Sequence, residues 1–297
     1  MTLLQYDDAF GRLIGQSPTY SLLFTTAGDP FFHEACIFLP AWDQLYITSN
    51  LIFLPTSTNF PSTLVSSIEL QRTSEDNVVH TATWHTLQPI PGIDLPNGGV
   101  NYKDGVLFCA QGSAQPGTGG IYYMSRTATP KAIVTNFHGR DFNSPNDAVV
   151  AQDGCIWFTD PCYGHDQGFR LRPKLPNQVY RFNPKTGDLR VVADGIGRPN
   201  GICFSPDEKV CYITDTDYIH GDGSRDHSRC VFSSARCCII LTDVALGQPR
   251  STRSISSTAL AHRFLATGEY SPLQLKVSRT VSSVMSTATS ILAVEME

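Results

Sequence analysis

One stretch of sequence occurs twice in this chain, and the repeat constrains the fold more than any other feature. Residues 144–160 read SPNDAVVAQDGCIWFTD, and residues 198–215 read RPNGICFSPDEKVCYITD. Each copy has a Pro-Asn turn, an apolar strand-like run, a second turn, and an aromatic run that ends in Thr-Asp. The shared order predicts two copies of one β unit with Asn146 and Asn200 at equivalent positions.

The second half of this unit occurs four times. Each copy is a turn with Asp or Gly followed by a short run of β-branched and aromatic residues, in DQLYITSN (43–50), DGVLFCAQG (104–112), DGCIWFTD (153–160) and DEKVCYITD (207–215). The copies recur at roughly 50–60 residues, a period typical of propeller blades. Further hairpins are predicted at 119–137 and 177–194, and helical periodicity is nearly absent. We therefore predict an all-β fold of the β-propeller type with about four blades encoded.

Composition limits the range of partners. The chain has 297 residues, a net charge of −5 and scattered Lys and Arg, so it lacks the basic surface that nucleic acid requires. No apolar run reaches membrane-spanning length, and the acidic N-terminus is unlike a signal peptide, so we expect a cytoplasmic protein. The nine cysteines contain no C-x-x-C pair, which favours buried reduced thiols over disulfides or metal ligation.

The sequence changes character near Arg229. We assign residues 1–229 to the propeller and residues 230–297 to a Ser- and Thr-rich tail that carries no further blade pattern. One interpretation of the tail is disorder. The alternative is a frame-shifted translation that follows a retained intron at roughly residues 231–247, because a shifted reading of the tail can encode a Pro-Asp-Gly segment, a strand, an Asp-Gly turn and an aromatic strand.

Polar residues precede the predicted innermost strands, and innermost strands line the channel of a propeller. Four of them are candidates for one shared site: Glu34, Asn97, Asn146 and Asn200. One carboxylate with amide oxygens suits Ca²⁺ or Mg²⁺, and with fewer ligands Mn²⁺ or Zn²⁺. The alternative is that each Asn only forms a turn, which applies most to Asn97 before Gly-Gly.

Other polar residues carry weaker signals. Asp160 and Asp215 end equivalent strands, and a structural role that braces turns is favoured over catalysis for both. We assign Asn97 and His165 to substrate binding, although a surface role is the default for a loop histidine. No G-x-S-x-G elbow and no Cys-His signature is present, which argues against covalent serine or thiol catalysis.

Several of these segments together resemble the SMP-30/gluconolactonase/LRE-like family in its fungal gluconolactonase-type branch. The resemblance covers about residues 30–228 and includes FHEACIFLP, LPNGGVNYKDGVLFCAQG, FNSPNDAVVAQDGCIWFTDPCYG and RPNGICFSPDEKVCYITD. It implies a six-bladed propeller that hydrolyses lactones such as aldonolactones, with one divalent cation held by Glu34, Asn146 and Asn200. The family's further ligand, an Asp in a Pro-Asp-Gly motif that is also the proposed general base, has no counterpart in this chain. The catalytic residue is therefore unassigned, and ring closure is incomplete.

We accordingly expect a monomeric lactonase that uses one divalent cation, with Ca²⁺ favoured over Zn²⁺, Mg²⁺ and Mn²⁺. Two alternatives stay open. One is an impaired or non-catalytic propeller scaffold that lacks the Asp ligand. The other is a related propeller esterase or phosphotriesterase that uses a similar ion.

Overall fold

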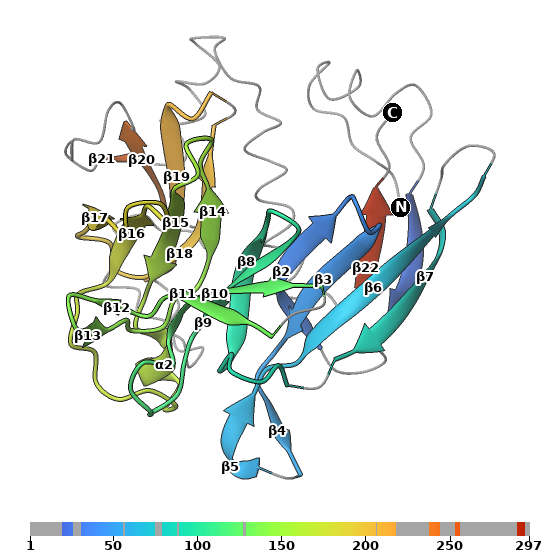
Figure 1. The fold of residues 1–297 in the computed structure, drawn as a ribbon, viewed down its shortest axis with the longest axis horizontal. Helices are drawn as coiled ribbons and strands as arrows, with labels where there is room; N and C mark the ends of the chain where they lie inside the picture. The colour runs from blue at the N-terminus through green and yellow to red at the C-terminus, as the bar shows by residue number, and fades with distance from the viewer. Residues whose placement is uncertain are drawn as a thin grey trace.

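The fold consists almost entirely of antiparallel β-sheet (Figure 1). The computed structural model describes residues 20–25, 31–55, 57–74, 79–87, 89–126, 129–205, 207–217, 238–243, 253–255 and 290–294. Within these ranges there is one short helix, α2 (Tyr163–Asp166). No described helix has the length and apolar character needed to cross a membrane.

Four sheets have four strands each, and in every sheet the strands follow one another along the chain. The first contains β2 (Phe32–Leu39), β3 (Gln44–Ser49), β6 (Val65–Arg72) and β7 (Val79–Thr86). The second contains β8 (Pro96–Tyr102), β9 (Gly105–Ala110), β10 (Gly120–Ser125) and β11 (Lys131–Val134). The third contains β14 (Ala148–Val150), β15 (Ile156–Asp160), β16 (Gln178–Phe182) and β17 (Leu189–Ala193). The fourth contains β18 (Pro199–Phe204), β19 (Val210–Asp215), β20 (Cys238–Asp243) and β21 (Arg253–Ile255).

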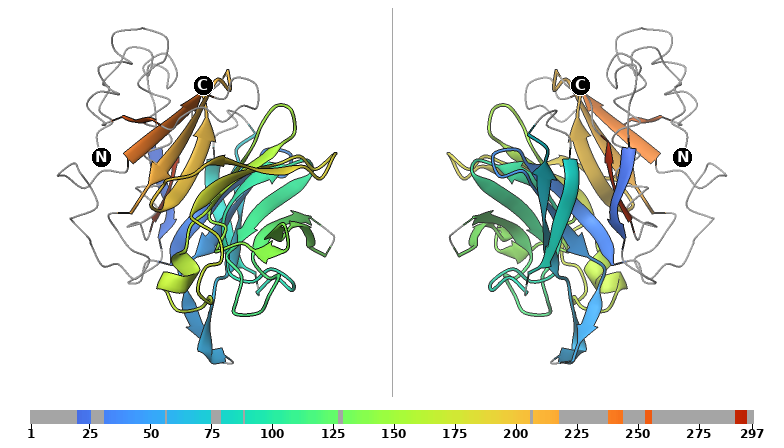
Figure 2. Two further views of the ribbon diagram at one scale, coloured as in Figure 1. Left: turned by 90° about the vertical axis from the view of Figure 1, so that its left-hand side faces the viewer. Right: turned by 90° about the vertical axis from the view of Figure 1, so that its right-hand side faces the viewer.

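Three two-stranded pairs complete the described fold. A hairpin of β4 (Ile52–Leu54) and β5 (Ser57–Ser62) leaves the first sheet between β3 and β6 and projects from the body (Figures 1 and 2). A second pair joins β12 (Asn136–Phe137) to β13 (Arg140–Asp141). In the third pair, β1 (Tyr20–Thr25) lies antiparallel to β22 (Ser290–Val294), so segments from near both chain ends meet.

The sequence repeats correspond to one position in the fold. The four repeated segments form β3, β9, β15 and β19, which are the second strands of the four sheets. The predicted hairpins at 119–137 and 177–194 contain β10–β11 and β16–β17. The predicted all-β class is therefore confirmed. Three strands lie beyond residue 229, where the sequence pattern predicts none: β20, β21 and β22. The rest of residues 230–297, and with it the frame-shift hypothesis, lies outside the described residues.

Hydrophobic layers separate neighbouring sheets, because successive side chains of a strand point to opposite faces. Val106 and Phe108 of β9 pack towards the first sheet, whereas Leu107 and Cys109 pack towards the third. In β15 the same alternation directs Phe158 to one layer and Trp157 to the next. A central strand buried on both faces needs apolar residues at every position, and this explains the runs VLFCA and IWF.

The first strands of the four sheets lie beside one another in chain order. β2 packs against β8, β8 against β14, and β14 against β18. Residues at the start of these strands are therefore brought together although they are far apart in the sequence.

Six described cysteines are free thiols, and of these Cys109, Cys155 and Cys211 are buried.

Candidate metal centre

Three of the four candidate residues lie where the first strand of a sheet loses regular pairing with the second. The β2–β3 register shifts on both sides of Glu34, the β8–β9 register shifts between Pro96 and Gly99, and the β18–β19 register shifts between Pro199 and Ile202. Asn97 and Asn200 fall inside the latter two irregularities. Bulges of this kind redirect side chains and are common next to active sites.

The backbone at Glu34 is also unusual. Ala35, the next residue, has a φ angle of 55°, in the left-handed region that a residue with a Cβ rarely occupies. Strain of this kind persists only where the surrounding structure enforces it, and it gathers at functional sites. The irregular backbone around Glu34 thus includes both a register shift and a left-handed residue.

Hydrogen bonds between sheets connect the three asparagines. Thr48 of the first sheet donates through Oγ1 to the Asn97 carbonyl oxygen at 3.0 Å. The Gly98 amide donates to the Asn146 carbonyl oxygen at 2.8 Å. Thr159 of the third sheet donates through Oγ1 to the Asn200 carbonyl oxygen at 2.6 Å. The backbone at each asparagine is thereby tied to the neighbouring sheet, and the structure joins Asn97, Asn146 and Asn200 into one row.

Asn146 presents a buried oxygen that no group in the described part of the chain satisfies. The residue is 4% exposed, and its backbone N–H and C=O are both bonded, to Thr159 and Gly98. Its Oδ1 atom is buried and accepts no hydrogen bond from any described residue. Such an atom costs free energy unless a ligand, ion or water occupies the space in front of it.

Glu34 adds a partly buried acidic group to the site. Burial raises the pKa of Glu34 from 4.5 to about 8, and the nearby charge of Asp147 raises it further in the same direction. Both effects disfavour the carboxylate: burial removes its solvation, and Asp147 repels its charge. A cation would reverse this balance and favour the ionised form of Glu34.

Asp147 is a residue that the sequence patterns did not single out. Its Oδ1 accepts from the Ala148 amide at 2.8 Å and its Oδ2 accepts from the Ile202 amide at 3.0 Å. Burial raises the pKa of Asp147 to about 6, and the two amides partly offset that rise. Because both oxygens accept from backbone groups, Asp147 joins the Asn146 turn to the strand of Asn200. Its position directly after Asn146 in Pro-Asn-Asp was the signal available in the sequence.

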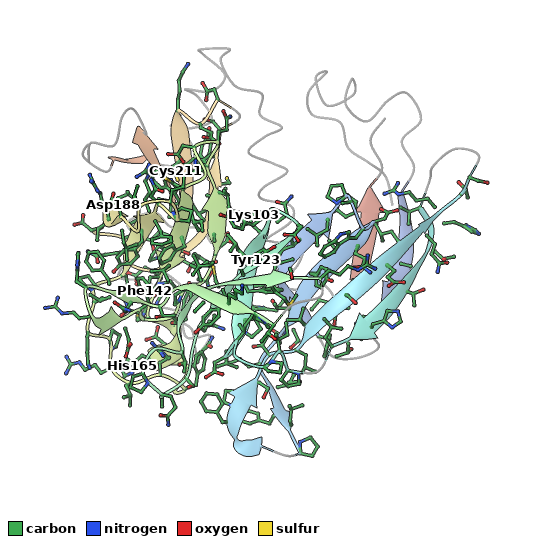
Figure 3. All side chains as sticks on the ribbon, in the orientation of Figure 1. Lys103, Tyr123, Phe142, His165, Asp188 and Cys211 are labelled. Atoms are coloured by element: carbon green, nitrogen blue, oxygen red, sulfur yellow. The ribbon has the colours of Figure 1, made fainter. Side chains whose placement is uncertain are left out.

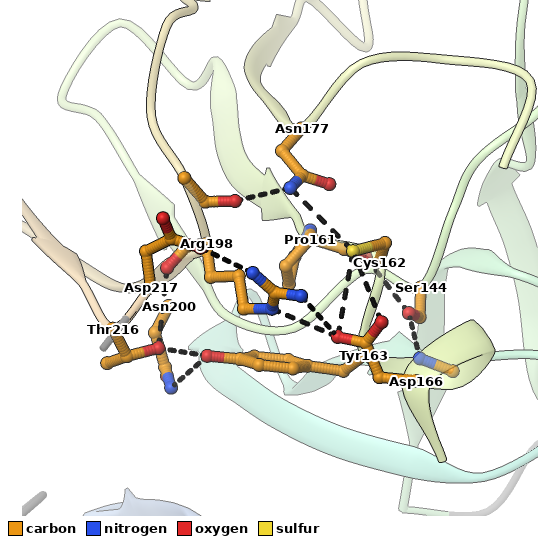
Figure 4. A network of polar contacts seen from close by, with 12 residues as sticks. Ser144, Pro161, Cys162, Tyr163, Asp166, Asn177, Arg198, Asn200, Thr216 and Asp217 are labelled. Atoms are coloured by element: carbon orange, nitrogen blue, oxygen red, sulfur yellow. Dashed lines mark hydrogen bonds and ion pairs between the residues drawn. The ribbon is translucent and has the colours of Figure 1, made fainter. Parts of the chain in front are cut away.

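Asn200 is held by its side chain as well as by its backbone. Its Nδ2 donates to the Tyr163 hydroxyl at 3.3 Å, and that hydroxyl contacts Thr216 Oγ1 (Figure 4). Tyr163 is buried in the first turn of α2, and the sequence patterns did not identify it either. The Tyr163 contact leaves the amide oxygen of Asn200 facing away from the tyrosine.

The two residues assigned to substrate binding differ in their placement. Asn97 is buried and lies in the row with Asn146. His165 is exposed on α2, towards the lower edge of the molecule in Figure 3. The structure connects His165 to the site only through α2, whose Tyr163 contacts Asn200. A cavity of about 600 Å³ opens elsewhere, between Ala132–Asn136 and Phe182–Leu189, and no candidate residue lines it.

The bracing role predicted for the two Thr-Asp carboxylates is confirmed. Asp160 accepts from the backbone amides of Asn143 and Ser144, at 2.9 and 2.8 Å. Asp215 accepts from the amides of Gly197 and Arg198, at 3.0 and 2.8 Å. In both cases the carboxylate holds the turn two to three residues before the candidate asparagine. The repeat in the sequence is therefore a repeat of this bracing arrangement.

The donor set fits a hard divalent cation. No three His, Cys, Asp or Glu side chains in the described part of the chain gather as a metal site, so binding would depend on amide oxygens. Glu34, Asn146 and Asn200 offer one carboxylate and two amide oxygens, and Asn146 Oδ1 has no partner among the described residues. Oxygen ligands of this kind suit Ca²⁺ or Mg²⁺.

Comparison with known proteins agrees with this fold. Residues 77–219 of the chain match the SMP-30/Gluconolactonase/LRE-like family. Lactonohydrolase oryL of Aspergillus oryzae is 30% identical over 227 residues, which cover 72% of this chain and 47% of that protein. A gluconolactonase of Zymomonas mobilis is 32% identical over 137 residues, which cover 44% of this chain and 37% of that protein. The Aspergillus relative fits the fungal type that the sequence resembles.

A solved gluconolactonase structure from Xanthomonas campestris has a similar fold. Its TM-score is 0.56 at 24% sequence identity, and the match covers 84% of this chain and 69% of that chain. At this identity the likeness shows the fold alone. The chain spans about half the length, or less, of the two curated relatives.

Proposed function

We propose that this chain is a lactone hydrolase that depends on one divalent cation, held by Glu34, Asn146 and Asn200. The observation that carries the proposal is the buried and unpartnered Oδ1 of Asn146, in the same hydrogen-bonded row as Asn200. The four consecutive sheets would be blades of a six-bladed propeller, with their first strands nearest the axis. The named activities of the two curated relatives support the reaction class.

The charge of the site favours this assignment. Glu34 supplies one negative charge, and the two amides supply neutral oxygens. A cation in this set retains net positive charge, and it would polarise a lactone carbonyl and acidify water. Ca²⁺ is the proposed ion, because it accepts carboxylate and amide oxygens in flexible geometry. Zn²⁺, Mg²⁺ and Mn²⁺ are the alternatives for the test.

The protein's own residues fix the geometry of the donors. The Thr159 and Asp147 hydrogen bonds hold the backbones of Asn146 and Asn200 at a set separation. Because these ligand atoms are already held in place, they need not reorganise when substrate binds. Asp147 acts as a support in this arrangement, because each of its oxygens accepts a backbone N–H group.

Calorimetry combined with hydrolysis assays tests this proposal. Full-length protein is titrated with CaCl₂, and hydrolysis of D-glucono-δ-lactone and of an aryl ester is followed with and without chelator. The Asn146→Ala variant should lose binding and lactone hydrolysis, whereas the control Asn101→Ala, at an exposed position of β8, should keep both. Chelator-sensitive lactone turnover supports the proposal.

Three other results would contradict the proposal. If the folded protein binds no divalent cation, the metal site is wrong. Cation binding without turnover would support a non-catalytic scaffold, which is the outcome expected if the missing Pro-Asp-Gly aspartate is essential. Ester turnover without lactone turnover would indicate the propeller esterase alternative.

A further inference from the structure

We propose that Tyr163 is a positioning residue that determines which end of the Asn200 amide faces the cation site. The inference rests on the proposed function, because it assumes that Asn200 binds a cation. A side-chain amide has an oxygen end that accepts and an NH₂ end that donates. Only the oxygen end can ligate a cation. If the amide rotated by half a turn, its NH₂ group would face the cation and repel it.

The hydrogen bonds around Asn200 link three donor groups in series: the Asn200 amide, the Tyr163 hydroxyl and the Thr216 hydroxyl. We call this series the hydrogen-bond chain. Asn200 Nδ2 lies 3.3 Å from the Tyr163 hydroxyl oxygen, which contacts Thr216 Oγ1. Thr216 Oγ1 in turn lies 3.4 Å from the Arg198 carbonyl oxygen. Figure 4 shows Asn200, Tyr163 and Thr216 in this sequence beside Arg198.

The Arg198 carbonyl oxygen is the last group of this hydrogen-bond chain, and it determines which group donates in each of the hydrogen bonds. A carbonyl oxygen can only accept, so the Thr216 hydroxyl donates its single proton to Arg198. Thr216 must then accept from Tyr163, and Tyr163, having donated its own proton, must accept from Asn200. Only the NH₂ end of the Asn200 amide can donate. The chain therefore directs Nδ2 towards Tyr163 and Oδ1 to the opposite side.

The groups at both ends of this chain are held firmly. The Thr216 amide donates to the Arg198 carbonyl at 3.0 Å, and the Gly164 amide next to Tyr163 donates to Ser144 Oγ at 2.8 Å. The Arg198 guanidinium bonds Asp166 at 2.9 Å and also pairs with Asp217, so it links α2 to the segment after β19. Burial raises the pKa of Tyr163 to about 12, and its hydroxyl stays protonated at neutral pH.

The backbone of Asn200 is fixed independently of Tyr163. Its carbonyl oxygen accepts from Thr159, and the strand after it is held by Asp147 through the Ile202 amide. Removal of the Tyr163 hydroxyl should therefore free the amide to turn without moving the main chain. The predicted defect is thus in cation affinity and not in folding.

The experiment compares variants that differ by a hydroxyl group. Tyr163→Phe and Thr216→Val interrupt the hydrogen-bond chain, and Thr216→Ser retains it. The control is Tyr122→Phe, because Tyr122 is also a buried tyrosine whose hydroxyl lies 3.3 Å from the carbonyl oxygens of Gly117 and Thr118. CaCl₂ affinity of each full-length variant is measured by calorimetry, and folding is checked by circular dichroism.

We expect Tyr163→Phe and Thr216→Val to bind Ca²⁺ about 10-fold more weakly, which is typical for residues that orient metal ligands. Thr216→Ser and Tyr122→Phe should bind like the wild type. If folded Tyr163→Phe and Thr216→Val bind Ca²⁺ normally, the positioning role is wrong while the proposed function stands. If Tyr163→Phe does not fold, the comparison of Thr216→Val with Thr216→Ser alone tests the positioning role. If the wild type binds no cation, the proposed function fails and this inference fails with it.

Discussion

Thr159 donates a hydrogen bond of 2.6 Å to the carbonyl oxygen of Asn200, although the two residues belong to different sheets. The same threonine bonds the Asn146–Asp147 turn through three groups: its amide, its carbonyl oxygen and its hydroxyl oxygen. Thr48 makes an equivalent bond to Asn97. One buried threonine therefore sets the separation of two proposed metal ligands.

Replacement of Thr159 by valine should loosen this connection. Valine has a similar volume but no hydroxyl, and it leaves the Asp147 amide and the Asn200 carbonyl without their partner. We expect a loss of about 1–3 kcal/mol in the free energy of unfolding, as for other buried polar groups left unpaired. Cation affinity should fall as well. Urea unfolding and calorimetry measure the two effects.

Thr159→Ser is the matched control for this prediction. Serine keeps the hydroxyl and should retain cation affinity, with a stability loss of about 1 kcal/mol from the missing methyl group. Equal Ca²⁺ affinity in the valine and serine variants would show that the hydroxyl does not position Asn200.

The sequence was sufficient to predict the strands that have regular patterns. The alternating or continuous apolar runs of β3, β9, β15 and β19 match sheet positions that are buried on one or both faces. It also predicted that Asn146 and Asn200 are equivalent, because the bracing carboxylates Asp160 and Asp215 repeat with them. Both predictions rest on local sequence patterns: apolar runs for the strands, and repeated turn residues for the asparagines.

The supports of the site could not be predicted in the same way. Asp147 acts on Ile202 and Tyr163 acts on Asn200 across long sequence separations, and no local pattern records such pairs. The strand β20 pairs with β19, and β21 pairs with β20, although their own sequence lacks the turn and strand pattern of the earlier sheets. Pairing to an existing strand edge can select a segment that local preference alone would not indicate.

The bracing carboxylates should contribute to stability in proportion to their burial. Asp160 is fully buried, whereas Asp215 is only partly buried. Asp160→Asn would place an NH₂ group against a backbone amide, and we expect it to lower the free energy of unfolding by about 1–3 kcal/mol. Asp215→Asn should cost less. Urea unfolding of both variants tests this order, and an equal or larger loss for Asp215→Asn would contradict it.

Cation binding should depend on pH through Glu34. Its pKa of about 8 lies above its usual 4.5, so the folded, cation-free protein holds this proton more tightly than the unfolded chain. This tighter proton binding stabilises the folded state. The stabilisation is fully present below about pH 4.5 and is lost as the pH rises through about 8. A cation favours the carboxylate and must displace the proton. Affinity for Ca²⁺ should therefore rise with pH up to about 8 and then level off.

Calorimetry in buffers of different ionisation enthalpy checks the Glu34 prediction. Below about pH 8 each bound cation should release up to one proton. The Glu34→Gln variant should bind more weakly and should show no such release. A wild-type affinity that is constant between about pH 6 and pH 8 would mean that Glu34 does not titrate with binding.

Two buried asparagines provide the sharpest contrast between a structural residue and a ligand. Oδ1 is unpartnered in both Asn143 and Asn146, but Asn143 Nδ2 donates to the carbonyl oxygens of Asp160 and Pro176 at 3.3 and 3.2 Å. Asn143→Ala should therefore cost about 1–3 kcal/mol of stability in the absence of cation. Asn146→Ala should cost about 1 kcal/mol or less, because it removes an oxygen that the protein leaves unsatisfied.

Added Ca²⁺ should reverse the ranking of these two variants. At a concentration 100 times the dissociation constant, a ligand that binds only the folded state stabilises it by about 2.7 kcal/mol. The wild type and Asn143→Ala should gain this stabilisation, and Asn146→Ala should gain none, as measured by urea unfolding with Ca²⁺ or with chelator. A Ca²⁺-dependent gain in Asn146→Ala as large as that of the wild type would exclude Asn146 from the metal site, because its amide oxygen would then contribute nothing to binding.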